Sequence, residues 1–297
     1  MAKVSVIIPA FNVEKYITTT LESLLVQNYS DFEIICVEDC SEDKTVKIIK
    51  NFANRNKKIK LIQNEKHLGP GECRNIALNN ANGKYIACVD ADDIVTKEYL
   101  SLPINKIEET NINAVWCKAN IYWEDEKRTT EMFTFPILQK EKEGFLELTP
   151  NNISNYPAYA WNKFFKKDCI DESIKWSNGL LFEDVEFYYR FYTQNPNIYV
   201  IDKPLYIYRR HKSSIMSKSI VDINYHKDLF TVTENIYNFL KEKDLFKKYK
   251  KSLLKLFMQN VNDFDKFPNL KTELAKTVVK TLKNIKFPSE YEDLKEV

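Results

Sequence analysis

Short apolar runs alternate with amphipathic segments along the first ninety residues. The runs are rich in β-branched side chains, which predicts buried strands. They lie at 4–8, 32–37, 59–63 and 85–89. Apolar residues between them recur at helical spacing and predict helices after Asn12, over 43–54 and over 70–81. Strand and helix units in this order predict an α/β fold, a mostly parallel sheet with helices on both faces.

The ends of the predicted strands give the first indication of where a ligand would bind. Pro9 is expected to stop the first strand, and Asn12 is expected to cap the helix that follows. In sheets of this kind, ligands bind beyond the carboxyl ends of the strands. The pattern therefore predicts functional residues at three turns, 9–12, 38–43 and 90–93.

The second half of the chain has a different character. Residues 95–180 mix aromatic and polar side chains with several prolines, which favours strands and loops over long helices. From 222 onward the apolar positions again fit helices, and 222–286 holds 14 lysines against 8 acidic residues. This change predicts a sheet-containing domain over 1–215 and a basic, helical C-terminal region over 216–297.

Composition excludes several classes of protein. The chain is 44% apolar and 29% charged, as in ordinary globular domains, and no apolar run is long enough to span a membrane. No export signal is visible at the N-terminus. A net charge of +2 argues against a nucleic-acid binder. The six cysteines lack the paired spacing of a zinc site, so we expect reduced thiols in a cytoplasmic protein.

The segment YIACVDADD places three carboxylates directly after a predicted strand, at Asp90, Asp92 and Asp93. Carboxylates so close together repel one another unless a cation lies among them. Hard oxygen ligands suit Mg²⁺ or Mn²⁺, particularly where substrate phosphates complete the coordination shell. The alternative is a solvated acidic turn in which Asp93 caps a helix beginning near Thr96.

Two residues at the other predicted turns could contact a nucleotide. Asp39 follows the second strand and could accept a hydrogen bond from a base or a ribose, although Ser41 and Asp43 nearby are typical of a helix cap. Phe11 offers an aromatic face on which a base could stack, although a single aromatic residue is more often part of the core.

The segment HLGPGECRN contains Gly69 and Gly71 in a turn ahead of a helix that carries Arg74. The guanidinium of Arg74 could pair with a pyrophosphate or with the acidic cluster. The glycines form neither a GxGxxG motif nor a P-loop, which argues against dinucleotide-dependent oxidoreductases and ATPases.

Two further segments carry titratable residues. Glu183 and Asp184 open a strongly aromatic helix, where a half-buried carboxylate can have a raised pKa suited to general-base catalysis. Alternatively, both acids only stabilise the helix dipole. The segment YRRHKSS, with Arg210 and His211, could form a basic turn that contacts phosphate or a metal, or a solvated loop.

Taken together, seven segments in order resemble glycosyltransferase family 2, whose members use nucleotide-sugars and have the GT-A fold. The resemblance covers about residues 3–215. The segments are VSVIIPAFN, EIICVEDCSED, NEKHLGPGECRNIAL, YIACVDADD, AWNKFFKKD, LFEDVEFYYR and YRRHKSSIM.

The resemblance implies roles for individual residues. Phe11 and Asp39 would hold the nucleobase, and Asp184 would be the catalytic base of an inverting transfer. Asp92 and His211 would bind the metal, Mn²⁺ or Mg²⁺, that the diphosphate also contacts. The set implied to bind the nucleotide-sugar is Pro9, Phe11, Asn12, Asp39, Arg74, Asp90, Ala91, Glu183 and Arg210. Glu38 and Cys40 depart from the usual Asp and Gly or Asn beside Asp39, which affects the expected base preference.

The family also implies a substrate class. A hexose or N-acetylhexosamine would pass from a nucleotide-sugar, expected to be UDP-linked, to a hydroxyl of a glycan or lipid-linked acceptor in bacterial lipooligosaccharide or capsule synthesis. The lysines of 222–286 favour peripheral contact with the anionic inner membrane, with a solvated helix face as the alternative.

Two other classes stay open on the same fold. A sugar-1-phosphate nucleotidyltransferase would need a Gly-rich basic loop after the first strand, which PAFN is not. A non-catalytic carbohydrate-binding protein would not need Asp39, the DxD segment and Asp184 together.

Overall fold

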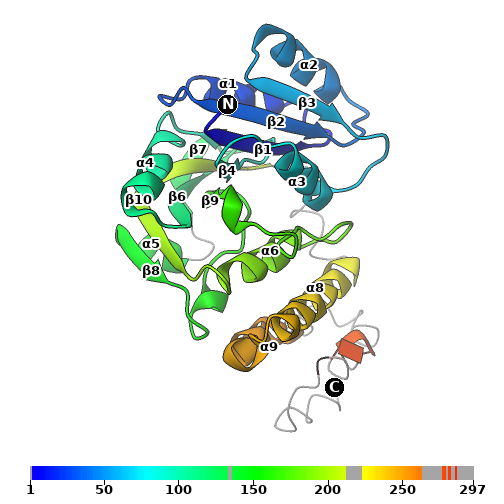
Figure 1. Cartoon of the computed structure of the whole chain (residues 1–297). Coiled ribbons are helices and arrows are strands. Elements are labelled where there is room, and N and C mark those ends of the chain that lie inside the picture. Colours follow the sequence, from blue (N-terminus) through cyan, green and yellow to red (C-terminus); the bar gives the residue numbers. More distant parts are fainter. Residues whose placement is uncertain are drawn as a thin grey trace.

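The computed structural model describes residues 2–132, 136–211, 223–262, 276–278, 280–281 and 285. In this part of the chain ten strands form one sheet with the order β3-β2-β1-β4-β9-β6-β10-β5, while β7 pairs with β6 and β8 with β10 (Figure 1). The strands are β1 (Val4–Ala10), β2 (Phe32–Glu38), β3 (Ile59–Gln63), β4 (Tyr85–Cys88), β5 (Ile94–Val95), β6 (Ala114–Trp123), β7 (Arg128–Glu131), β8 (Gly144–Glu147), β9 (Lys163–Lys166) and β10 (Asn197–Arg210).

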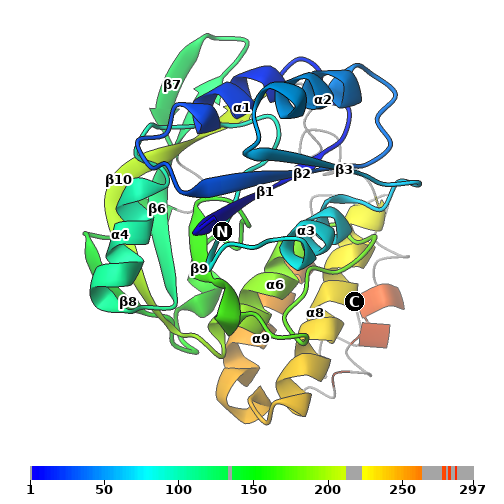
Figure 2. The ribbon, with the colours of Figure 1, turned by 45° about the horizontal axis from the view of Figure 1, so that its top comes forward.

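Helices cover both faces of this sheet, as the sequence predicts (Figure 2). They are α1 (Ile17–Leu25), α2 (Thr45–Arg55), α3 (Pro70–Asn79), α4 (Ser101–Thr110), α5 (Pro136–Lys140), α6 (Glu183–Tyr192), α8 (Ile223–Glu242) and α9 (Phe246–Asn262), with short 3₁₀ helices at Ile153–Asn155 and Lys167–Cys169. Over the described residues of 95–180 strands and loops predominate, as expected, and the helices are the ten-residue α4 and short ones such as α5.

The strand directions bring the predicted turns to one edge of the sheet. Strands β1, β2, β3 and β4 are parallel, and β9 runs antiparallel between β4 and β6. Strand β10 is parallel to β6. The carboxyl ends of β1, β2, β4, β6 and β10 therefore lie at the same edge as the first residue of β9, and this edge carries the turns 9–12, 38–43 and 90–93.

Two expectations for the first turn are wrong. Pro9 does not end β1 but pairs with Val37 inside it. The backbone nitrogen of Pro9, which has no hydrogen to donate, points toward the side of β4. Because β4 ends at Cys88, there is no strand residue opposite this nitrogen, and no hydrogen bond between the strands is lost. Asn12 does not cap α1, because Tyr16 precedes the first helical residue. Asn12 instead has a positive φ of 52° in the loop before the helix.

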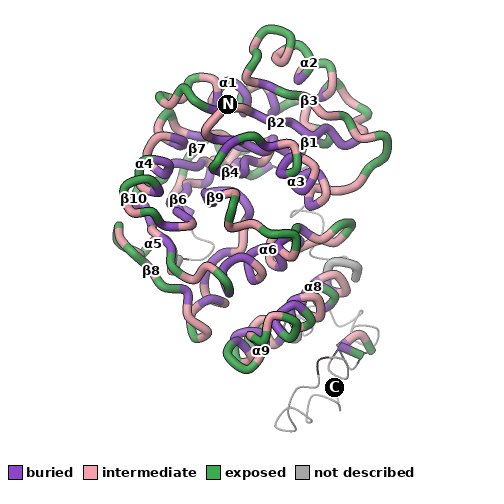
Figure 3. The backbone as a smooth tube through the Cα atoms, in the orientation of Figure 1, coloured by how far each residue is buried: buried purple, intermediate pink, exposed green. Residues whose placement is uncertain are grey.

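The core consists of two clusters, one on each face of the sheet. Buried residues follow strands β1, β2 and β4 at the centre of the sheet (Figure 3). Alternate residues of a strand point to opposite faces. Accordingly, Val6 and Ile8 of β1 pack with α1 and α4, whereas Ile7 packs with α3 and α6. The aromatic face of α6 is buried as predicted, with Phe187 stacked on Trp176 at 3.9 Å between ring centroids.

The C-terminal helices α8 and α9 join the cluster that contains α6. Of the apolar positions expected from the sequence, Leu256 is only partly buried and Val261 lies outside the residues whose burial is described, whereas seven are buried. The buried positions are Leu229, Val232, Ile236, Phe239, Leu240, Leu253 and Phe257. The predicted boundary at 215 falls outside the described residues, so the division into two domains stays a prediction.

The opposite face of α9 exposes Lys247, Lys248, Lys251 and Lys255. No helix in the described part of the chain has the length and apolar character required to cross a bilayer. Contact of 222–286 with a membrane surface therefore rests on these lysines and stays a prediction.

Candidate active site

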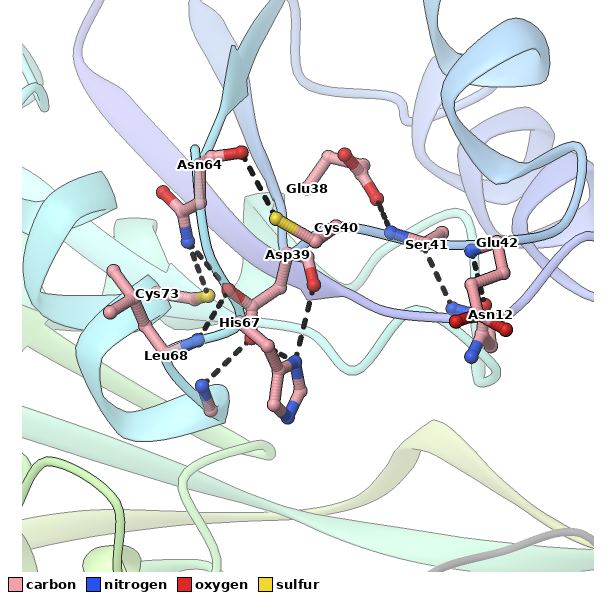
Figure 4. Close-up of polar contacts among 11 residues, drawn as sticks. Asn12, Glu38, Asp39, Cys40, Ser41, Glu42, Asn64, His67, Leu68 and Cys73 are labelled. Carbon is pink, nitrogen blue, oxygen red and sulfur yellow. Dashed lines mark hydrogen bonds and ion pairs between the residues drawn. The ribbon is translucent and has the colours of Figure 1, made fainter.

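The loops after β1 and β2 are tied to each other by Asn12. Its backbone amide donates to Ser41 Oγ at 3.0 Å, and its Oδ1 accepts from the amide of Glu42 at 2.9 Å (Figure 4). The left-handed backbone of Asn12 suits an asparagine better than most residues. Asn12 therefore holds the predicted nucleotide-binding turn in place through contacts with protein atoms.

Asp39 lies at the end of β2 with its carboxylate almost fully buried. Oδ1 accepts from Asn64 Nδ2 at 2.7 Å and from the amide of Leu68 at 2.9 Å. Oδ2 accepts from the amide of Gly69 at 2.7 Å and lies 2.9 Å from His67 Nδ1. The two carboxylate oxygens offer about four acceptor positions, so these four donors occupy all of them (Figure 4).

Phe11 is not part of the core. It is 41% exposed, and its ring lies against that of His67 with 4.3 Å between centroids. An exposed aromatic face next to a buried carboxylate can bind a planar base that stacks on one and donates to the other.

The three carboxylates of the turn after β4 have three different partners. Asp90 Oδ1 accepts from Arg74 at 2.8 Å, and Asp92 Oδ2 lies 2.9 Å from His211 Nε2. Asp93 is fully buried and accepts from the Tyr206 hydroxyl at 2.6 Å. Asp93 is therefore neither solvated nor a helix cap, and the short strand β5 follows the turn where a helix near Thr96 was the alternative.

Burial explains the protonation behaviour of Asp93. Removal from water raises its pKa well above the ordinary value, and the neighbouring carboxylates of Asp92 and Asp90 add to the rise. Asp93 Oδ1 also accepts from the backbone amide of Arg209 at 2.7 Å, which fastens the acidic turn to β10. This residue is structural.

The guanidinium of Arg74 joins the acidic turn to α6. It donates to Asp90 at 2.8 Å and to Glu183 Oε1 at 2.6 Å, which confirms pairing with the acidic cluster. Burial would lower the pKa of Arg74, but the two carboxylates raise it, so the group stays charged. Gly71 allows the start of α3 to lie against the segment before α6, because a Cβ at position 71 would lie 2.3 Å from the carbonyl oxygen of Ser177.

Asp184 is the second residue of α6, beside Glu183. Burial raises the pKa of the Asp184 carboxyl to about 7, Glu183 adds to the rise, and the cations of Arg74 and Lys163 oppose it. A carboxyl group with this pKa can accept a proton near neutral pH. The structure thus gives the Asp184 carboxyl group the raised pKa that the sequence pattern predicts.

Lys163, the first residue of β9, is buried and interacts electrostatically with this carboxyl group. Its Nζ donates to the carbonyl of Tyr159 at 2.7 Å and to Asn162 Oδ1 at 3.1 Å. Burial lowers the pKa of Lys163 to about 7, and the charge of Asp184 opposes the shift. The two groups therefore influence each other's ionisation.

His211 follows the last residue of β10, and its ring packs on that of Tyr16 with 4.3 Å between centroids. Arg209 and Arg210 belong to β10 rather than to the basic turn that the sequence suggested. Arg210 is exposed and lies over the ring of Trp123, while Lys212 falls outside the described residues.

A metal ion would need ligands from the substrate here. No group of three or more His, Cys, Asp or Glu side chains among the described residues could hold one alone. The pair Asp92 and His211 supplies one oxygen and one nitrogen donor, and the Asp92 side chain is 25% exposed. This donor set fits Mn²⁺ or Mg²⁺ if phosphate oxygens complete the shell.

Comparison with known proteins decides the family. The profile of the family described as Glycosyl transferase family 2 matches residues 5–170. The chain belongs to this family. It is therefore a glycosyltransferase, and the alternatives of a nucleotidyltransferase or a non-catalytic carbohydrate-binding protein are set aside.

Relatives agree with this assignment. Glycosyltransferase GlyG of Streptococcus pneumoniae is 29% identical over 236 residues, which are 76% of this chain and 76% of that protein. Glycosyltransferase GlyA of the same organism is 30% identical over 72% of this chain, but the match spans only 31% of GlyA. The poly(ribitol-phosphate) β-N-acetylglucosaminyltransferase TarS of Staphylococcus aureus is 39% identical over 40% of this chain and 21% of its own.

Solved structures confirm the GT-A fold. S. aureus TarS residues 1–349 in complex with UDP has a TM-score of 0.66 and 26% identity, covering 99% of this chain and 90% of that one. The Pyrobaculum calidifontis mannosyltransferase PcManGT, in complex with GDP-Man and Mn²⁺, has a TM-score of 0.56 and 14% identity, covering 95% of this chain and 73% of that one.

The structure brings most of the predicted site of this glycosyltransferase to one edge of the sheet. Ala91 is buried in the turn after β4 and accepts from Thr20 Oγ1 at 2.9 Å through its carbonyl, a structural contact. Sequence reasoning missed His67, Lys163 and Tyr206. His67 and Lys163 stood inside segments that carry the family resemblance, but nothing in the pattern marked them as different from surface residues.

Arg74→Met should destabilise the folded state, because it leaves the buried carboxylate of Glu183 and the partly buried carboxylate of Asp90 without their cation. We expect a loss of about 3–5 kcal/mol in the free energy of unfolding, measured by chemical denaturation. Arg55→Met removes an exposed arginine from the end of α2 and should change stability by less than about 0.5 kcal/mol. Equal stability of the two variants would contradict a structural role for the Arg74 bridge.

Proposed function

We propose that this glycosyltransferase is an inverting, metal-dependent enzyme that uses a UDP-sugar. It moves a hexose or N-acetylhexosamine to a hydroxyl of a glycan or lipid-linked acceptor in the synthesis of a bacterial surface polysaccharide, such as lipooligosaccharide or capsule. The observation that carries the proposal is the partly buried carboxyl group of Asp184, with a pKa of about 7, at the edge that also carries Asp39 and Asp92.

The nucleotide end of the site is compatible with a uridine donor. The carboxylate of Asp39 accepts hydrogen bonds only, so a base that contacts it must present an N–H group, as uracil does at N3. Phe11 supplies the exposed face on which the base stacks. The similarity to TarS in complex with UDP points to the same nucleotide.

The diphosphate end combines three chemical groups. Asp92 and His211 would hold Mn²⁺ or Mg²⁺, and such an ion would neutralise charge on the leaving diphosphate. Arg210 is exposed at the end of β10 and can contact a phosphate directly. Asp90 is held by Arg74 and borders the same site.

The reaction follows from the position of the base. The acceptor hydroxyl attacks the anomeric carbon on the face opposite the nucleotide, and Asp184 takes its proton. A bond forms between the acceptor oxygen and the anomeric carbon while the bond from that carbon to the diphosphate oxygen breaks. The nucleoside diphosphate leaves with the electron pair. A single displacement of this kind inverts the anomeric configuration.

Asp184→Asn should lower the hydrolysis of UDP-N-acetylglucosamine in the presence of Mn²⁺ by at least about 100-fold, because an amide cannot take the proton. UDP binding, measured by calorimetry, should stay within about twofold of the wild-type value. Asp244→Asn is the matched control, since Asp244 has a φ of 56° that asparagine also tolerates and lies between α8 and α9. Undiminished turnover in Asp184→Asn would remove the base assignment.

The rate of hydrolysis should rise with pH through about 7, because Asp184 acts only after it has lost its proton. Lys163→Met removes a cation that lowers the pKa of Asp184, so the midpoint of the pH–rate profile should move to higher pH. Lys166→Met changes a buried lysine at the other end of β9 and should leave the midpoint in place. A midpoint unmoved by Lys163→Met would show that this cation does not act on the base.

Asp92→Ala should abolish the gain in UDP affinity that Mn²⁺ provides, a loss of about tenfold or more, because one of two protein ligands is removed. Binding of UDP without metal should change little. Calorimetry with and without Mn²⁺ measures both values. If Mn²⁺ strengthened UDP binding equally in the variant and the wild type, the metal would not lie at Asp92.

A further inference from the structure

The carboxylate of Asp39 has no acceptor position left for a nucleobase. Its four donors are the amides of Leu68 and Gly69, the Asn64 side chain and His67 Nδ1 (Figure 4). A base that donates to Asp39 must therefore replace one of them. This step rests on the proposed function, which assigns Asp39 to the nucleobase.

Only one of the four donors can leave without disturbing the fold. The two amides belong to the backbone that leads into α3. The Asn64 side chain is fixed by a second contact, 3.4 Å from Cys73 Sγ, and its backbone amide donates to Glu38. The side chain of His67, in contrast, is 55% exposed and can rotate into solvent.

The protonation of His67 follows from its contacts. Nδ1 lies 2.9 Å from Asp39 Oδ2 and 3.2 Å from the Asp39 carbonyl oxygen, and both atoms only accept hydrogen bonds. Nδ1 must therefore carry a proton. The imidazole presents to Oδ2 a ring N–H, the same kind of group that uracil presents at N3.

The His67 ring contacts both residues that the proposed function assigns to the base. Its centroid lies 4.3 Å from that of Phe11, with the two planes tilted by 42°, at the exposed entrance to Asp39. One planar ring thus contacts the Phe11 ring and donates an N–H to Asp39 at the same time. These are the two contacts that the proposed function assigns to the nucleobase.

We propose that His67 is the resident hydrogen-bond donor of Asp39 and is exchanged for the N–H of the nucleobase when the donor substrate binds. His67 keeps the buried carboxylate satisfied while the site is empty. The His67 side chain competes with the base for Asp39 Oδ2, so the residue at position 67 sets the affinity for the nucleotide. It also sets the selectivity, because only a base with an N–H group can replace the His67 N–H.

The test is the affinity for uridine monophosphate, which contains the base but not the sugar or the second phosphate. His67→Ala removes the competing donor and should tighten binding by about three- to tenfold, the effect of one hydrogen bond. His67→Phe keeps an aromatic ring without an N–H and should also bind more tightly than the wild type. Phe11→Ala removes the stacking face and should change affinity in the opposite direction, so the two residues are distinguished by sign.

A second measurement follows the exchange directly. The wild-type imidazole nitrogens are observed by ¹⁵N NMR, and the Nδ1 signal that is absent in His67→Ala should shift when uridine monophosphate is added. Thermal unfolding of each variant in the absence of nucleotide confirms that it is folded.

Each outcome has one meaning. Weaker or unchanged binding by His67→Ala, or an Nδ1 signal that does not move on saturation, would overturn the exchange while leaving the proposed function intact. A wild-type protein that binds neither uridine monophosphate nor UDP with Mn²⁺ would overturn the uridine donor and the exchange together.

Discussion

The site depends on one buried cation. Arg74 bridges Asp90, which lies 16 positions further along the chain, and Glu183, which lies 109 positions further. It therefore holds the turn after β4 against the start of α6. Without this cation, the buried carboxylate of Glu183 and the partly buried carboxylate of Asp90 would repel each other. Asp184 is the neighbour of Glu183, so the same bridge fixes the distance between the base and the diphosphate end of the site.

The carboxylates at this edge differ in what they can still accept, and this difference separates their tasks. Asp93 is buried with the Tyr206 hydroxyl and a backbone amide, and it serves the fold. Asp39 is filled by donors of the chain, so a ligand reaches it only by exchange. Among the described residues, the Asp92 carboxylate contacts one imidazole through one oxygen, and its side chain is partly exposed, so it can bind an added cation. Burial and existing partners, more than residue type, decide which carboxylate takes which role.

The sequence predicts the sheet edge well because two simple rules determine it. Continuous apolar runs mark buried strands, and parallel strands place their carboxyl ends together, which located Asp39 and Asp90. The expectations that Pro9 ends β1 and that Asn12 caps α1 are wrong for reasons outside their own segment. Pro9 fits inside β1 because the neighbouring strand β4 ends early, and Asn12 is held by the loop after β2. Lys163 shows the limit of local patterns, since its burial arises from the insertion of β9 between β4 and β6, which no periodicity in its own segment encodes.

The C-terminal helices also contribute to the geometry of the base. The amide of Leu181, three residues before Asp184, donates to Asp228 Oδ2 of α8 at 2.9 Å, and Asn235 of α8 donates to Glu186 Oε2 at 2.9 Å. The start of α6 is therefore held on one side by Arg74 and on the other by α8. A helical region that the sequence suggested as an addition to the sheet thus shares a core with α6 and restrains the segment that carries Asp184, and a rigid base is what general-base catalysis requires.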